Sequence, residues 1–307
     1  MPVRALQRVA TVASATAPYN TIQLKLFYPA LDATTEEHYQ TGVLPFDTQF
    51  SPAPVVIFLP GVNCSAHTYE WLATNLAENG IVTVIASWLA QNLPGRFSIS
   101  PGIDLDAVHV DNYGTRPTSS SLQTIIDALK TLSSETVLAG NVRGNFIFGG
   151  HSAGGTMALQ NARHDWFPEV IGAFSCCANP LATSVLGNWG KGNIPPLPTD
   201  VPVFMIGVSE DGIGDHHVKH FGNTDESGAD YIRRIFNEAN YTDGKLHIFD
   251  GANHHTICHP ADHSIGRIFM DSPATGDESA IRQQMSQMIS DFVHETVTKK
   301  TQIHEKL

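Results

Sequence analysis

The strongest constraint on the fold of this chain is a Gly-x-Ser-x-Gly pentapeptide, Gly-His-Ser-Ala-Gly, at residues 150–154. It follows the apolar run 146–148, which predicts a strand, and precedes residues 155–163, which predict a helix. A sharp strand-to-helix turn holds a serine hydroxyl clear of its own backbone, and the two glycines let neighbouring backbone pack closely enough to form it. The pattern therefore predicts Ser152 as a nucleophile and the N–H of Ala153, at the start of a helix, as an oxyanion donor. The alternative is a glycine-rich turn in which Ser152 only caps the helix.

The rest of the chain alternates between runs of β-branched and aromatic residues and amphipathic segments. This alternation predicts an α/β fold with a mostly parallel, doubly wound sheet, preceded by an antiparallel strand pair. Neither a repeat nor a linker divides the sequence, so we expect one domain over residues 1–307. The predicted strands are 9–16, 21–28, 54–59, 81–86, 146–148, 170–176, 201–208 and 246–249, and the predicted helices are 66–79, 122–132, 155–163, 231–239 and 281–292.

Four long segments follow predicted strands: residues 92–121, 181–199, 212–230 and 255–280. Irregular segments of this length inside a compact domain are more often functional than accidental. We expect them to be loop insertions that form a partial lid over the active site. The aromatic residues expected to line the pocket beneath it are Trp88, Phe97, Tyr113, Trp189 and Phe221. Residues 32–52 are also expected to be a loop.

The net charge of −12 argues against nucleic acids and anionic membranes as partners, because both attract basic surfaces. We expect no membrane span, since no run approaches the ~18 apolar residues that one needs. Polar residues interrupt the N-terminal 17 residues, which predicts no signal peptide and a cytoplasmic location. Four cysteines, two of them adjacent, predict no disulfide framework. The oligomeric state stays open.

The histidine count is high, at fifteen, with clusters at 216–220 and 254–263. Both clusters lie in segments rich in glycine and aspartate, without a helical i, i+4 pair supported by carboxylates. We therefore expect no functional metal site and no cofactor, and we expect one of these histidines to be catalytic.

Polar groups follow three of the predicted strands, at the edge of an α/β sheet where ligands bind. In chain order they are Ser152, Asp211 and His254, the order of nucleophile, acid and base in an α/β-hydrolase triad. We predict that His254 accepts the serine proton and that Asp211 orients its imidazole. The rivals are His255 for the base and Glu210, Asp215 or Asp250 for the acid, whereas a plain turn at 211–212 would leave the triad without an acid.

A second oxyanion donor is expected from the segment Leu-Pro-Gly-Val-Asn-Cys at 59–64, which follows another predicted strand. We assign that donor to the backbone N–H of Val62, with the N–H of Ala153 as its partner. The alternatives are the N–H of Asn63, one position later, and a simple Pro-Gly turn with no catalytic role.

At these residues the chain resembles the α/β-hydrolase superfamily, in the branch of cutinase-like polyester hydrolases, platelet-activating-factor acetylhydrolases, chlorophyllases and dienelactone hydrolases. The resemblance covers residues 20–297 and implies a cofactor-free serine esterase with a backbone oxyanion hole. Ala153, Val62 and the segment Ala-Asn-Pro at 178–180 replace residues typical of the polymer-degrading members, which argues against polymer hydrolysis. The motifs that carry the resemblance are Phe-Tyr-Pro-Ala at 27–30, Phe-Leu-Pro-Gly at 58–61, Thr-Arg-Pro at 115–117, Gly-His-Ser-Ala-Gly-Gly at 150–155, Ser-Glu-Asp at 209–211 and Gly-Ala-Asn-His at 251–254.

The sequence thus predicts a serine hydrolase that cleaves small to medium carboxylic esters through an acyl-enzyme. The same triad would serve a thioesterase, a lactonase, an amidase or an acyltransferase, because all share the acyl half-reaction. A non-catalytic binding protein on the same scaffold is the third hypothesis, and it is normally accompanied by loss of a triad residue.

Overall fold

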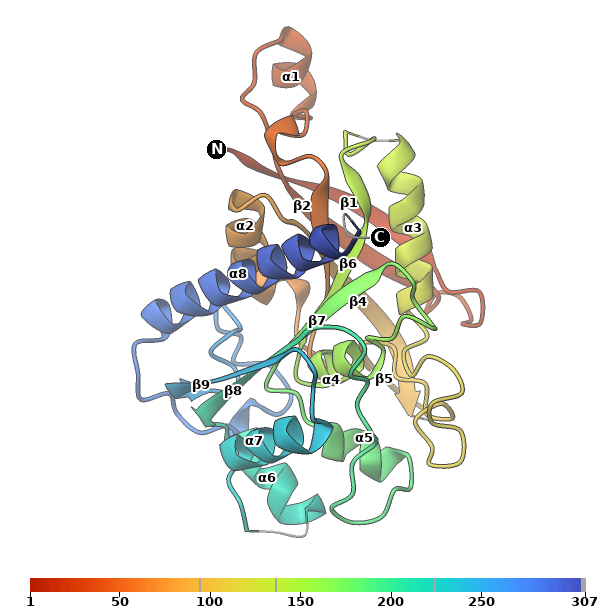
Figure 1. Cartoon of the computed structure of the whole chain (residues 1–307), viewed down its shortest axis with the longest axis vertical. Coiled ribbons are helices and arrows are strands. Elements are labelled where there is room, and N and C mark those ends of the chain that lie inside the picture. Colours follow the sequence, from red (N-terminus) through yellow and green to blue (C-terminus); the bar gives the residue numbers. More distant parts are fainter. Residues whose placement is uncertain (94, 136, 223–224, 305–307) are drawn as a thin grey trace.

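The computed structural model describes residues 1–93, 95–135, 137–222 and 225–304 and places nine strands of this part of the chain in one sheet (Figure 1). Along the main path the strand order is β1-β2-β4-β3-β6-β7-β8-β9, and β5 pairs with β4 alone. The strands are β1 (Val3–Thr11), β2 (Thr21–Pro29), β3 (Ala53–Leu59), β4 (Val82–Leu93), β5 (Arg96–Ile99), β6 (Val142–His151), β7 (Val170–Cys176), β8 (Val203–Glu210) and β9 (Gly244–Asn253).

The sheet is mostly parallel, as predicted. From β4 through β3, β6, β7 and β8 to β9 each neighbouring pair is parallel, whereas β1, β2 and β5 pair in antiparallel fashion. Every residue of β3 and β7 is buried. These strands are continuous apolar runs because a parallel sheet is covered by helices on both faces.

The helices form a layer on each side of the sheet. On one side α2 (Glu70–Glu78) contacts α8 (Glu278–His304), and both contribute to a core cluster with residues of β3, β7 and β8. On the other side α3 (Leu122–Glu135), α4 (Ala153–Gln160) and α7 (Gly228–Ala239) pack against the sheet. Figure 1 shows α2 and α8 together, opposite α3. The predicted site residues Ser152, Asp211 and His254 follow the carboxyl ends of the parallel strands β6, β8 and β9.

Several predicted boundaries were wrong. The first strand begins at Val3 and ends at Thr11, so the expected strand over 9–16 overlaps it only in part. β4 extends to Leu93 and forms a hairpin with β5, inside a segment expected to be irregular. Residues 66–79 begin as a 3₁₀ turn, Ala66–Tyr69, before α2. Residues 32–52 contain a short helix, α1 (Glu36–Thr41), and a 3₁₀ turn, Thr48–Phe50.

Two segments expected to be loops contain helices. α5 (Pro180–Leu186) has a proline in its first turn, where a missing N–H costs nothing. α6 (Gly212–Phe221) is capped by Asp211, whose side chain accepts a hydrogen bond from the N–H of Gly214. The glycines and prolines of these stretches suggested loops, but the proline at the start of α5 and the aspartate cap of α6 favour helices. Residues 94 and 223–224, which belong to two of the predicted loop segments, lie outside the described residues.

Candidate active site

Ser152 lies at a strained turn between β6 and α4. Its backbone has φ 54° and ψ −121°, a conformation that costs a non-glycine residue about 1–3 kcal/mol. Its side chain makes no capping hydrogen bond to the first turn of α4. The structure therefore contradicts the alternative in which Ser152 serves only as a helix cap, and it places the hydroxyl at the end of the strand as predicted.

Two glycines allow this turn because backbone approaches them closely on both sides. A Cβ atom on Gly150 would lie 2.4 Å from the carbonyl carbon of Gly154. A Cβ atom on Gly154 would lie 2.0 Å from the carbonyl oxygen of Leu59, at the end of β3. The glycines of the motif thus permit the packing of α4 against the sheet.

We expect Gly154→Ala to destabilise the protein by at least about 3 kcal/mol, the upper end of the usual cost of overpacking. The clash is with backbone, which cannot rotate away as a side chain would. Urea unfolding followed by circular dichroism measures the change. Gly144→Ala is the matched control, because its Cβ atom would only touch the Glu169 side chain at 3.4 Å. Equal stabilities of the two variants would contradict the close approach at Gly154.

Asp211 and His254, far apart in the sequence, meet at the ends of β8 and β9. His254 Nδ1 lies 2.9 Å from Asp211 Oδ1, and both side chains are buried. A carboxylate accepts here, so Nδ1 carries the hydrogen and Nε2 keeps a lone pair for accepting a proton. The same Asp211 oxygen accepts a hydrogen bond of 2.7 Å from the N–H of Gly214, which fixes the carboxylate at the start of α6.

The two groups shift each other's pKa in opposite directions. Burial alone would lower the pKa of His254, but the charge and hydrogen bond of Asp211 outweigh it and raise that pKa above its ordinary value. Burial alone would raise the pKa of Asp211, but His254 and the N–H of Gly214 lower it. Asp211 is therefore an anion at neutral pH and stabilises an imidazolium beside it.

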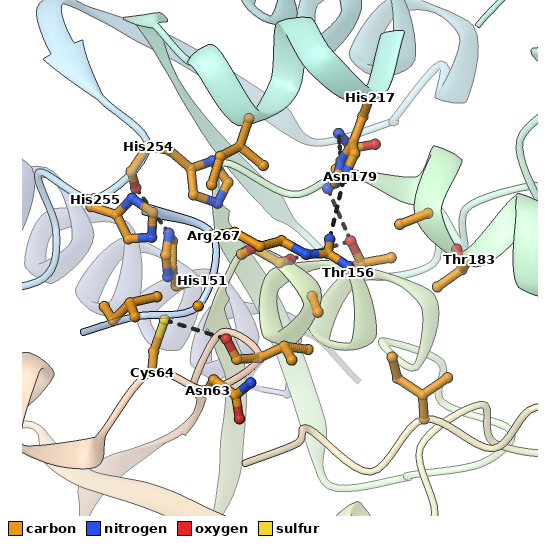
Figure 2. A pocket seen from close by; sticks show the side chains of 18 of the residues that line it. Asn63, Cys64, His151, Thr156, Asn179, Thr183, His217, His254, His255 and Arg267 are labelled. Carbon is orange, nitrogen blue, oxygen red and sulfur yellow. Dashed lines mark hydrogen bonds between the residues drawn. The ribbon is translucent and has the colours of Figure 1, made fainter. Parts of the chain in front are cut away.

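Ser152, Ala153, Val62 and His254 all line one cavity of about 160 Å³. Figure 2 shows His254 with His255 and His151 on one side of this cavity. Among the described residues, the Ser152 hydroxyl forms no hydrogen bond with either ring nitrogen of His254. The structure thus brings the predicted acid and the predicted base together and places the predicted nucleophile, Ser152, in the same cavity without a hydrogen bond to His254. In enzymes without a bound substrate such contacts are often loose.

The two candidate oxyanion donors of the loop after β3 differ in their hydrogen bonds. The N–H of Asn63 donates to the carbonyl of Ile99 at 3.0 Å, so it is already used. In the described part of the chain the N–H of Val62 has no such acceptor. The N–H of Ala153 is in the first turn of α4, where N–H groups lack an acceptor within the helix. This geometry favours Val62 over Asn63.

The rivals for acid and base have other partners, although His255 lines the same cavity as His254. His255 Nδ1 pairs with Asp271 Oδ2 at 2.8 Å, and the two carboxylate oxygens of Asp271 also accept from the N–H groups of His254 and His255. Asp271 lies in a segment without a motif, so sequence analysis could not single it out. Of the predicted acids, Glu210 accepts from Ser209 and Asp215 accepts from the N–H of Gly228. Within the described ranges, Asp250 makes no hydrogen bond with either histidine.

The wall of the cavity opposite His254 contains three polar side chains that the sequence analysis did not place at the site: Asn179, His217 and Arg267. Arg267 Nη1 lies 3.3 Å from His217 Nε2, and the Asn179 amide lies 2.9 Å from His217 Nδ1 (Figure 2). Burial lowers the pKa of His217 to about 4, so the ring is neutral. Because arginine only donates, Nε2 accepts and Nδ1 carries the hydrogen. The structure places the amide nitrogen of Asn179 at Nδ1 and leaves the amide oxygen without a partner. Since Nδ1 carries the hydrogen, we assign the flipped amide, in which the oxygen accepts from Nδ1.

The pocket wall is aliphatic and polar, not aromatic. None of the five aromatic residues predicted to line it is among the described lining residues; Trp88, for example, is buried and donates to the carbonyl of Tyr19, and Phe97 stacks on Tyr19. Tyr113 and Trp189 pack edge to face, and Phe221 packs against His217. Each of the four long segments nevertheless supplies wall residues, although their role as a lid stays a prediction. These residues are Ile103; Ala182, Thr183 and Leu186; Ile213 and His217; and His255, Ile265, Gly266 and Arg267.

No protein-family model and no curated protein sequence matches the chain. Among solved structures it resembles a ferulic acid esterase from Streptomyces cinnamoneus (18% identity, TM-score 0.55, 95% of this chain and 88% of the other). It also resembles esterase 2 of Thermogutta terrifontis phosphonylated by cyclosarin (13%, 0.53, 95% and 94%). A third is a dienelactone hydrolase-like promiscuous phosphotriesterase from metagenomic libraries (13%, 0.52, 94% and 98%).

These likenesses extend over nearly the whole chain, so the chain has the α/β-hydrolase fold. At such low identities they concern the fold alone. None of the helices in the described ranges is long and apolar enough to cross a membrane.

Proposed function

We propose that this protein is a serine hydrolase that cleaves carboxylic esters of small to medium size. The observation that carries the proposal is the buried hydrogen bond between Asp211 and His254, in a cavity that Ser152 also lines. The strained backbone of Ser152 adds support, because such strain persists only where the surrounding structure holds it and is concentrated at active sites. The fold is shared with proteins described as esterases.

In the proposed reaction, Ser152 Oγ attacks the ester carbonyl carbon while His254 Nε2 takes the hydroxyl proton. The carbonyl oxygen becomes an oxyanion, held by the N–H groups of Val62 and Ala153. His254 then gives its proton to the departing alcohol oxygen, and the C–O bond breaks to leave an acyl-serine. Water repeats the sequence: His254 takes its proton, the acid is released, and Ser152 regains its hydrogen.

The same residues would also cleave a thioester, a lactone or an amide, or pass the acyl group to an alcohol. We favour an ester because its alcohol leaves more readily than the amine of an amide. The residues named above also suffice for ester cleavage. A binding protein without catalysis is the remaining alternative, although Ser152, His254 and an acidic partner are all present.

We expect hydrolysis of p-nitrophenyl esters to fall as the acyl chain grows from acetate to palmitate. The cavity beside Ser152, at about 160 Å³, is smaller than the 300–1,000 Å³ typical of pockets for larger ligands. Initial rates over the series at fixed pH, with kcat and KM separated for each ester, measure the preference. Thioester and amide analogues of the best acyl group then test the leaving group.

Rates that rise toward long chains would contradict the size of the pocket and favour a lipase-like enzyme. No turnover of any ester would refute ester hydrolysis and leave the binding protein as the leading alternative.

A further inference from the structure

The loop after β3 and the loop after β9 each carry a buried cysteine, and the two cysteines meet beside His151. The Sγ atoms of Cys64 and Cys258 and a ring nitrogen of His151 lie within 4.8 Å of one another. All three side chains are buried, and Figure 2 shows Cys64 close to His151. The Tyr69 hydroxyl completes the group, 2.8 Å from His151 Nδ1 and 3.7 Å from Cys258 Sγ. The proposed hydrolysis uses none of these side chains.

The hydrogen bonds of His151 fix which of its nitrogens can act as a ligand. Nε2 lies 2.9 Å from the carbonyl oxygen of His254, which only accepts, so Nε2 carries the hydrogen and Nδ1 keeps its lone pair. A histidine that binds a metal commonly donates its other N–H in this way to a backbone carbonyl or a carboxylate.

A small space beside these atoms is left open by Gly61. A Cβ atom at this position would lie 3.0 Å from His151 Nδ1 and 3.1 Å from Cys64 Sγ, so both atoms face the same place. The Cys64 thiol also has only a long contact to give up, to the carbonyl oxygen of Val62 at 3.8 Å.

We propose that Cys64, His151 Nδ1 and Cys258 form a binding site for a thiophilic divalent cation, Zn²⁺. Thiolate and imidazole are the donors that zinc prefers, and two thiolates offset the charge of the cation in a buried place. Tetrahedral zinc, with Zn–S bonds of about 2.3 Å and Zn–N bonds of about 2.0 Å, holds its ligand atoms about 3.5–3.8 Å apart. From the observed upper limit of 4.8 Å, the group needs to contract by about 1.3 Å at most.

Binding moves protons but needs no redox partner. The two thiol protons leave to solvent, and the Tyr69 hydroxyl gives up its hydrogen bond to Nδ1. The cation can enter from the cavity, which both Cys64 and His151 line. A metal at this site would link three segments: the loop after β3 through Cys64, the end of β6 through His151, and the loop after β9 through Cys258. Its role is to hold these segments together. This proposal does not depend on the proposed hydrolysis.

The test is the binding of Co²⁺ to the full-length protein after reduction and chelation. We expect one equivalent of Co²⁺ to give the visible bands of a tetrahedral site and the near-ultraviolet thiolate charge-transfer band, and Zn²⁺ to displace it. Cys64→Ala and Cys258→Ala should each weaken binding by about tenfold or more. Cys176→Ala is the matched control, because this cysteine is equally buried but lies outside the cluster.

A second measurement needs no variant. X-ray absorption at the zinc edge of the wild-type protein should show two sulfur ligands at about 2.3 Å and one or two nitrogen or oxygen ligands. It keeps the proposal testable if the alanine variants fail to fold.

Three results would overturn the proposal. The first is a fully reduced protein that gives no cobalt spectrum. The second is a spectrum that survives both alanine substitutions in the cluster but disappears in Cys177→Ala, which would move the metal to the other buried group, Cys177 with Asp211 and His254. The third is a disulfide between Cys64 and Cys258 in purified protein that still binds no zinc once it is reduced.

Discussion

Ser152→Ala lowers kcat for p-nitrophenyl acetate by about 10³-fold or more, the scale on which serine hydrolases respond to loss of the nucleophile. The fold should be unaffected, because the Ser152 side chain makes no capping hydrogen bond and alanine meets the same backbone strain at φ 54°. The measurement is steady-state hydrolysis, with thermal unfolding of both proteins as the check on folding.

Ser175→Ala is the control for that result. Ser175 lies in β7, opposite Gly150 of β6; its side chain is buried, and its hydroxyl has no hydrogen-bond partner among the described residues. Its removal should leave kcat within about twofold, because no buried group loses a partner. A Ser152→Ala variant with wild-type kcat would show that another group attacks the ester.

Asp211→Asn lowers kcat by about 10⁴-fold and moves the acid limb of the pH–rate profile to lower pH. In the wild type the rate should be lost as the pH drops through the pKa of His254, because the protonated ring cannot accept the serine proton. Asp211 raises that pKa, so the midpoint of the loss should lie above pH ~6.5, the ordinary value for histidine. Without that charge, burial dominates and lowers the pKa of His254. Asparagine is also a good helix cap, so α6 keeps its start.

Asp271→Asn separates the two histidine–aspartate pairs. Asp271 binds His255 and the backbone near it, so its replacement should cost far less than 10⁴-fold. Its charge supports that of Asp211 in raising the pKa of His254, so the acid limb should move to lower pH, but less than in Asp211→Asn. The reverse outcome, with a large loss for Asp271→Asn and a small one for Asp211→Asn, would assign the base to His255.

The sequence predicts those strands of the sheet whose residues are nearly all apolar and therefore must be buried. β3 and β7 are continuous apolar runs, and only a strand covered on both faces accommodates them. Gly80, with φ 79°, ends the α2 region where the sequence predicts a stop. The Gly-x-Ser-x-Gly turn is predictable for the same reason, since few other conformations accept its close backbone contacts.

The sequence fails where tertiary contacts decide. α5 and α6 lie in stretches rich in glycine and polar residues. Their formation depends on packing against each other and against α4 and α7, and that of α6 also on its Asp211 cap. The wall formed by Asn179, His217 and Arg267 joins three distant segments, and none of them carries a motif. Asp271 is found only once the turn after β9 is in place, because its main contacts are backbone N–H groups.

Covalent labelling with a fluorophosphonate tests the central claim most directly, since one of the similar esterases was solved in a phosphonylated form. The proposed mechanism predicts that intact-protein mass spectrometry shows a single adduct, that the modified peptide carries it on Ser152, and that labelling slows in Asp211→Asn and disappears in Ser152→Ala. A protein that hydrolyses esters but stays unlabelled, or that carries the adduct on another residue, would contradict Ser152 as the nucleophile.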